Sequence, residues 1–195
     1  RINSKGKYSF TYGRLDALIR MPKTANGLWP AFWLMGDDYD QVGWPACGET
    51  DIVEMGHATG MAQGTQDRFF NGACHWGPAW NNKGDYSRDT TAPYGMQDDF
   101  HLYTCIWTED ELAMYYDLDE DPNREPYFRM TITRTAGYEN NELHVGNYFH
   151  KPNFILFNLA VGGNFPGLYD PAQITALNDG PASMYVDYVR LYVKE

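Results

Sequence analysis

Phe100-His101-Leu102-Tyr103-Thr104-Cys105-Ile106-Trp107 is the stretch that decides the fold class. Side chains of an extended strand point alternately to its two faces. One face of this stretch would carry Phe100, Leu102, Thr104 and Ile106, and the other would carry the residues between them. Residues 112–116 repeat the alternation with Leu112, Met114 and Tyr116. The spacing predicts antiparallel β-strands.

The same alternation recurs elsewhere in the chain. In residues 7–12 the rings of Tyr8, Phe10 and Tyr12 fall on one face, and after Gly13 the apolar row shifts to Leu15, Ala17, Ile19 and Met21. A glycine at such a change of phase predicts a bulge or bend. Residues 154–161 are apolar on both faces, which predicts a central strand, and residues 183–194 alternate again.

Turn sequences such as Asn26-Gly27 and Gly162-Gly163-Asn164 separate these strands, and only residues 172–177 resemble even a short helix. No linker, low-complexity tract or internal repeat divides the chain. We therefore expect one all-β domain of two packed sheets, a sandwich or jelly roll. A curved sandwich has a concave face, and aromatic rings on that face would stack on the C–H faces of sugars.

The charge composition of the chain excludes several classes of binding partner. The chain has 15 basic and 26 acidic residues, a formal net charge of −11, and no run of Lys or Arg. A nucleic acid, an acidic membrane surface or a sulfated polysaccharide would be repelled. No apolar run is long enough for a transmembrane helix. Cys47, Cys74 and Cys105 are too few for a disulfide framework, so we expect buried thiols with at most one bridge.

Three acids crowd the segment Gly48-Glu49-Thr50-Asp51-Ile52-Val53-Glu54-Met55, whose β-branched residues predict a strand. On an unbroken strand Glu49 and Asp51 would share a face and Glu54 would point to the other. One bulged residue between Asp51 and Glu54 would bring all three carboxylates together. Such crowding raises at least one pKa, and a protonated acid beside an ionised one suits a retaining glycosidase. The alternative is a solvated strand face whose charges point to water.

Longer strings around these acids carry a family resemblance. Gly27-Leu28-Trp29-Pro30-Ala31-Phe32-Trp33-Leu34-Met35, followed by Gly43-Trp44-Pro45-Ala46-Cys47-Gly48-Glu49-Thr50-Asp51-Ile52-Val53-Glu54, resembles glycoside hydrolase family 16 and its laminarinase-type endo-β-1,3-glucanases. The resemblance continues through residues 72–76 and 157–167 to residues 184–192. It implies a curved, concanavalin A-like jelly roll with a concave substrate cleft. Glu49 would be the nucleophile, Glu54 the general acid/base, and Asp51 the carboxylate between them.

The substrate implied is β-1,3-glucan, or mixed-linkage β-1,3-1,4-glucan, cleaved by an endo-acting retaining mechanism. The substrate-binding candidates are Trp44, His75, Trp33, Arg20 and Trp76. Packing in the core is an equally good interpretation of Trp33. A charged strand end in water is a nearly equal alternative for Arg20. Trp29 is expected to pack in the core. Galactan cleavage of the agarase or carrageenase type is one alternative function, and a non-catalytic β-glucan-binding module is another.

The resemblance also implies that no cofactor is required. Many family members hold a structural calcium, for which Asp187 is a candidate ligand, with a solvated strand Asp as the alternative. Family members carry further N-terminal strands, so residues 1–195 are expected to be a single glycoside hydrolase domain that lacks them. A complementary N-terminal fragment or second chain would then be a partner. The substrate class implies a secreted protein, extracellular or periplasmic.

Overall fold

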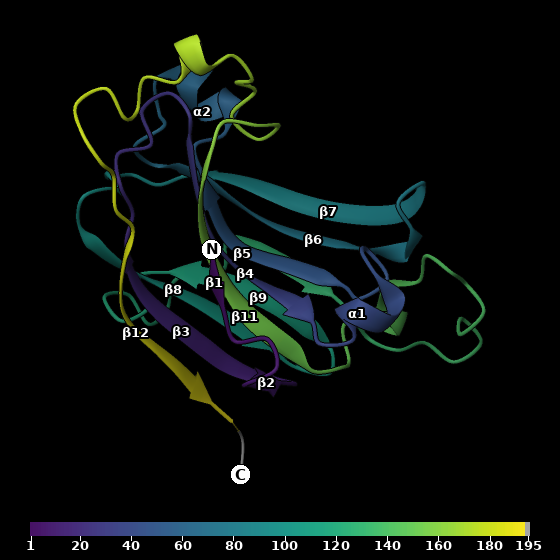
Figure 1. Cartoon of the computed structure of the whole chain (residues 1–195). Helices are drawn as coiled ribbons and strands as arrows, with labels where there is room; N and C mark the ends of the chain where they lie inside the picture. Colours follow the sequence, from purple (N-terminus) through teal and green to yellow (C-terminus); the bar gives the residue numbers. More distant parts are fainter. Residues whose placement is uncertain (194–195) are drawn as a thin grey trace.

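The structure, a computed structural model, describes residues 1–193, and its framework is two antiparallel sheets packed face to face (Figure 1). The seven-stranded sheet runs in the order β1 (Ile2–Asn3), β11 (Asn153–Val161), β4 (Leu28–Gly36), β5 (Glu49–Met55), β6 (Phe69–Ala79) and β7 (Asn82–Thr91), and β2 (Ser9–Phe10) also pairs with β11. The five-stranded sheet runs in the order β10 (Phe128–Thr131), β9 (Glu111–Tyr116), β8 (Phe100–Trp107), β3 (Gly13–Arg20) and β12 (Tyr185–Tyr192). The predicted jelly-roll sandwich is confirmed.

The predicted apolar rows form the core between the two sheets. Leu15, Ala17, Ile19 and Met21 are each at most 1% exposed. They belong to one cluster with Phe32 and Leu34 of β4 and Tyr103 of β8. Burial of these rows removes apolar surface from water, which is the main force that holds two sheets together.

The predicted bend at Gly13 is a switch between sheets. Of residues 7–12 only Ser9 and Phe10 form a strand, and they pair with β11 of the seven-stranded sheet. Tyr12 and Gly13 then take positive φ angles of 64° and 130°, and β3 begins in the other sheet. A Cβ at Gly13 would lie 2.7 Å from the Tyr192 carbonyl oxygen, so only glycine fits this corner.

Three expectations need correction. The strand at residues 154–161 has β4 along one side, but only the two-residue strands β1 and β2 on the other, so it lies near the sheet edge rather than at its centre. The helix expected at residues 172–177 is a 3-10 turn at Pro171–Gln173, where Pro171 and the side chain of Asp170 favour a helix start that does not propagate. Two short helices, α1 (Tyr39–Val42) and α2 (Ala58–Gln63), were not expected, because neither has an amphipathic pattern. A second 3-10 turn spans Val145–Asn147.

The last predicted strand forms β12 at an edge of the five-stranded sheet, and Lys194 of that prediction lies outside the described residues. The register against β3 shifts between Val186 and Tyr188, which makes Asp187 a bulge residue. Several rings and aliphatic side chains of this edge are exposed, among them Tyr185, Val189 and Tyr192.

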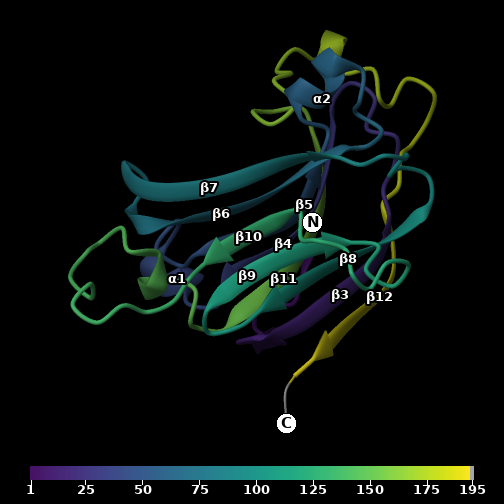
Figure 2. The ribbon, with the colours of Figure 1, turned by 180° about the vertical axis from the view of Figure 1, so that it is seen from behind.

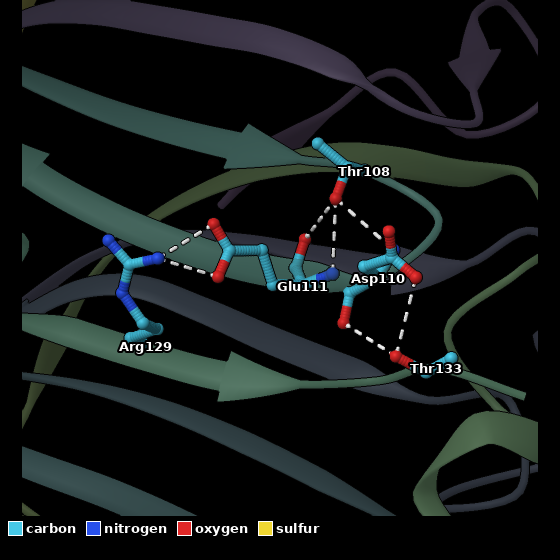
Figure 3. Close-up of polar contacts among 5 residues, drawn as sticks. All are labelled: Thr108, Asp110, Glu111, Arg129 and Thr133. Carbon is cyan, nitrogen blue, oxygen red and sulfur yellow. Dashed lines mark hydrogen bonds and ion pairs between the residues drawn. The ribbon is translucent and has the colours of Figure 1, made fainter.

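Polar contacts organise the hairpin of the five-stranded sheet, which is seen from behind in Figure 2 and in detail in Figure 3. The hydroxyl oxygen of Thr108 accepts hydrogen bonds from the backbone N–H groups of Asp110 and Glu111 at 3.2 and 3.1 Å. Arg129 of β10 donates two bonds, at 2.9 and 2.7 Å, to the carboxylate of Glu111 on β9. These contacts lie in exposed positions, so they stabilise the turn between β8 and β9 and the pairing of β9 with β10, and they add little to the core.

All three cysteines are buried and free, as expected of apolar packing residues. Within residues 1–193, no helix has the length and apolar character needed to cross a membrane.

Candidate active site

A bulge in β5 brings the three acids of residues 49–54 to one face, as the sequence predicts. Asp51 pairs with Trp33 and Val53 with Phe32, so one extra residue of β5 lies between these pairs, and the pairing with β6 shifts between Asp51 and Glu54. Such a bulge rotates the following side chain by half a turn. Glu49, Asp51 and Glu54 therefore face outward from the core, while Ile52, Val53 and Met55 are fully buried within it.

These carboxylates line a pocket of about 470 Å³ on the outer face of the seven-stranded sheet. Its other lining residues are Arg1, Trp29, Ala31, Trp33, Asn158, Leu159 and Ala160. Strand pairing explains the set, because Ala31 lies opposite both Glu54 and Asn158, and residues directly opposite in an antiparallel pair point to the same side. The pocket combines aromatic walls with an acidic floor, a pairing typical of carbohydrate sites.

Glu54 is 8% exposed and accepts a hydrogen bond of 2.8 Å from Nε1 of Trp29. The Trp29 ring stacks on Phe165, with 5.0 Å between ring centres and 9° between ring planes. Burial raises the pKa of Glu54 to about 7, with the Trp29 bond lowering it and the charge of Glu49 raising it. Trp29 was expected to be a packing residue, and its indole N–H instead makes it part of the site.

Glu49 lies at the other end of the carboxylate row. Burial raises its pKa to about 7, and a hydrogen bond with the Trp44 side chain and the charge of Lys83 act in the opposite direction. Both glutamates thus hold pKa values near neutrality, and their negative charges repel. At neutral pH the pair retains a proton, so one carboxyl group is an acid while its neighbour is an anion.

Asp51 lies between the glutamates, is 4% exposed, and has its Oδ2 3.5 Å from Nε2 of His75. Burial, followed by the charges of Glu49 and Glu54, raises its pKa well above the ordinary value. Burial, followed by the charge of Lys83, lowers the pKa of His75. His75 is therefore neutral at neutral pH and donates no full positive charge to the acid row.

The structure brings together most of the predicted substrate-binding residues. Trp33 lines the pocket, and its Nε1 donates a 2.7 Å bond to Oδ1 of Asn158. His75 lies directly across from Glu49. The ring centre of Trp44 is 6.1 Å from that of His75. Trp33, His75 and Trp44 therefore surround the carboxylates.

Arg20 and Trp76 do not belong to this pocket. On β3, Ile19 faces the core, so the next residue, Arg20, faces away from it, and its guanidinium lies 4.2 Å from the Tyr185 ring centre. On β6 the side chains alternate in the same way, so that His75 faces outward and Trp76 inward. Trp76 packs on the core, and its Nε1 donates a 2.9 Å bond to the Leu143 carbonyl.

Sequence reasoning did not single out Asn158, Phe165 or Trp80. Asn158 is a polar residue within an otherwise apolar strand, and that signal was available in the sequence. Phe165 and Trp80 lie in loops, where strand periodicity says nothing about direction. Their proximity to the site, with Trp80 5.7 Å from the Trp44 ring centre, follows from tertiary structure alone.

Among residues 1–193, Glu49, Asp51 and His75 are the group of side chains that could hold a metal ion, with ligand atoms within 4.8 Å of one another. Asp187, the calcium candidate, is exposed on the β12 bulge and belongs to no such group within that range. The prediction of a structural calcium, like that of a cofactor-free reaction, stays a prediction.

Comparisons with known proteins agree with this geometry. The family model described as "Glycosyl hydrolases family 16" matches residues 1–145. The chain is 33% identical over 198 residues to "Glucan endo-1,3-beta-glucosidase A1" of Niallia circulans, an alignment that covers 100% of this chain and 26% of that protein. It therefore spans about a quarter of that relative's length.

Solved structures resemble the whole described fold. A GH16 protein from Bacteroides ovatus, solved in complex with a G4G4G3G product, has a TM-score of 0.84 and 40% identity, over 97% of this chain and 73% of that chain. The laminarinase catalytic domain from Thermotoga maritima has a TM-score of 0.73 and 29% identity, over 99% of this chain and 68% of that chain.

Proposed function

The chain belongs to glycosyl hydrolase family 16, and on this premise we propose that it is an endo-acting, retaining β-glucanase. Its substrate is β-1,3-glucan of the laminarin type, together with mixed-linkage β-1,3-1,4-glucan. The observation that carries the proposal is the bulge of β5, which presents Glu49, Asp51 and Glu54 side by side in an aromatic pocket.

The reaction follows from a pair of carboxyl groups that shares a proton. Glu54 in its acid form protonates the glycosidic oxygen, while ionised Glu49 attacks the anomeric carbon and forms a glycosyl-enzyme. Glu54 then removes a proton from water, which hydrolyses the intermediate and restores the starting configuration. The raised pKa of both glutamates, caused first by burial, supports proton exchange near neutral pH.

Asp51 and Trp29 hold this machinery in place. The carboxyl group of Asp51 lies between the two glutamates. Because its charge acts on both of them, the three acids titrate as a coupled group. Trp29 donates to one oxygen of Glu54, which leaves the other oxygen for the glycosidic bond. Trp33, with its N–H already bonded to Asn158, offers ring surface to a sugar.

The net charge of −11 favours a neutral glucan over a sulfated galactan, which argues against a carrageenase-type activity. A non-catalytic glucan-binding module is disfavoured because both Glu49 and Glu54 are present and lie in the pocket. A polysaccharide substrate further supports a secreted location, extracellular or periplasmic.

Product analysis on laminarin, lichenan, agarose and carrageenan tests the proposal. We expect oligosaccharides from laminarin and lichenan, and a first-formed anomer of retained configuration by NMR. Glu54→Gln should lower hydrolysis roughly a thousandfold, because the amide cannot donate the proton, yet it can still accept from Trp29. Glu111→Gln, which changes a partly exposed acid of the other sheet, is the matched control and should keep full activity. Release of no reducing ends from either glucan would refute the proposed function.

A further inference from the structure

Trp80 is the most exposed of the large hydrophobic side chains in the described chain, with 72% of its surface accessible to solvent. It lies in the turn between β6, which ends at Ala79, and β7, which begins at Asn82 (Figure 1). Exposure of a whole indole forgoes the stabilisation that burial of its apolar surface would supply. Its place beside Trp44 makes this exposed indole a candidate for contact with a ligand.

The Trp80 ring belongs to a row of rings that leads from this turn to the carboxylates. The ring centres of Trp80 and Trp44 are 5.7 Å apart, and their planes are tilted by 39°. The ring centres of Trp44 and His75 are 6.1 Å apart, and Nε2 of His75 is 3.5 Å from Asp51. The row therefore continues the pocket past Glu49.

Polar groups accompany this row. Nζ of Lys83 lies 5.7 Å from the Trp44 ring centre and 3.2 Å from a carboxylate oxygen of Asp85. An ammonium group and a carboxylate beside exposed rings match the two surfaces of a sugar, whose C–H faces are apolar and whose rim carries hydroxyls. A purely apolar partner, such as a lipid or a protein core, would offer these charged groups no hydrogen-bonding atoms, whereas the hydroxyls of a sugar would.

The two indoles cannot hold one sugar between them. A ring stacked on both sides needs about 7 Å between the flanking planes, since each van der Waals contact takes about 3.5 Å. The observed separation of 5.7 Å is shorter. A glucan that stacks on both indoles therefore places a different sugar unit on each, and the tilt of 39° then sets the angle between the two sugar planes.

We propose that Trp80 and Trp44 form an aromatic shelf that binds two neighbouring glucosyl units of the glucan on the Glu49 side of the pocket. The shelf selects units whose planes are turned relative to each other, as across a β-1,3 linkage, over the flat ribbon of consecutive β-1,4 linkages. This inference rests on the proposed function, because it takes the glucan as the ligand.

Binding to a non-hydrolysing variant tests the shelf. Glu49→Gln serves as the parent, and its affinities for laminaribiose, laminarihexaose and cellohexaose are measured by isothermal titration calorimetry. Adding Trp80→Ala should weaken laminarihexaose binding about tenfold, the upper range of one aromatic stack. Laminaribiose, which is short enough to occupy the pocket without the shelf, should lose less. Since Trp80 is exposed, the variant should fold, and its thermal unfolding is checked in parallel.

Tyr8→Ala in the same parent is the matched control, because Tyr8 is 51% exposed and lines none of the pocket. Unchanged laminarihexaose affinity in the Trp80→Ala variant would overturn the shelf. An equal loss for cellohexaose would overturn its selection of turned units. A parent that binds none of the glucans would instead refute the proposed function, which separates the two failures.

Discussion

Two buried aspartates of this protein, Asp51 and Asp117, have opposite environments. Asp51 is 4% exposed and Asp117 is 2% exposed. Asp117 accepts hydrogen bonds from Tyr94 Oη at 2.9 Å and from the backbone N–H of Leu102 at 3.0 Å, and it lies 2.9 Å from Nδ1 of His101. Among residues 1–193, Asp51 has only His75 within ion-pair distance, at 3.5 Å, and two glutamates as neighbours.

Their pKa values move in opposite directions as a result. Burial acts to raise the pKa of Asp117, but the hydrogen bond and charge of His101, with Tyr94 and Leu102, outweigh it and lower the pKa. At Asp51 burial and the two glutamates act together and raise the pKa. A buried carboxylate that accepts several hydrogen bonds stays ionised and stabilises the fold. A buried carboxylate with few hydrogen-bond donors has a raised pKa and can exchange a proton near neutral pH.

Removal of Asp117 should have the largest effect on stability. Asp117→Ala leaves His101, the Tyr94 hydroxyl and the Leu102 N–H without their acceptor, and we expect a loss of about 3–5 kcal/mol, as for one partner of a buried pair. Urea unfolding followed by circular dichroism measures it. A loss below 1 kcal/mol would show that water replaces the carboxylate, and the comparison with Asp51 would fail.

The two sites should respond to pH in opposite senses. The folded pKa of about 7 for Glu49 and Glu54 lies above their ordinary value of 4.5, so the unfolded chain loses these protons first as pH rises. The free energy of unfolding should therefore fall between pH 4.5 and 7. A glutamate whose pKa rises from 4.5 to about 7 on folding contributes about 3 kcal/mol to this fall. Asp117 contributes stability above its ordinary pKa of 3.8 that is lost as pH falls through its lower folded value.

Urea unfolding of the wild type and of Glu49→Gln/Glu54→Gln across this pH range checks the sign. The double variant should lose most of the decline between pH 4.5 and 7 and keep the acid limb. A decline of equal size in both proteins would show that Glu49 and Glu54 are not its origin.

Neutralising Asp51 should have a smaller effect, and of opposite sign to that of Asp117→Ala. Asp51→Asn replaces an acid whose ionised form is disfavoured by burial and by two neighbouring acids, so we expect a gain of about 1 kcal/mol in the free energy of unfolding. Hydrolysis should nevertheless slow, because the titration of the two glutamates is then uncoupled from a third acid. Chemical denaturation and laminarin kinetics are compared on the same samples, and a destabilised Asp51→Asn would contradict the assignment.

The smallest effect is expected at an ion pair on the surface of the five-stranded sheet. Arg129 and Glu111 make a bidentate contact with side chains 50% and 32% exposed, so Arg129→Ala should cost less than about 1 kcal/mol. Glucan hydrolysis should be unchanged, since this pair belongs to the other sheet. Raising the salt concentration should reduce the difference further, because surface ion pairs are screened.

Local patterns predicted the strands and the acid row because their signals lie within a few residues. The period of two identified β3, β8 and β9, and the crowding of Glu49, Asp51 and Glu54 predicted the bulge of β5. Arg20 and Trp76 were proposed from residue type and motif, without knowing which strand face lines the pocket, and the structure places both outside it. Alternation says that neighbours differ in direction, but not which of them faces the cleft.

The sequence by itself therefore determined an all-β chain, a bulged strand with three acids, and membership of glycosyl hydrolase family 16. Tertiary structure alone decided that Trp29 bonds to Glu54, that Trp80 lies beside Trp44, and that Asp117 is a structural carboxylate. The physical reason is distance along the chain. Backbone periodicity is a local property, whereas a hydrogen bond between residues 29 and 54 or a ring contact between residues 44 and 80 exists only after the sheet has set the register of its strands.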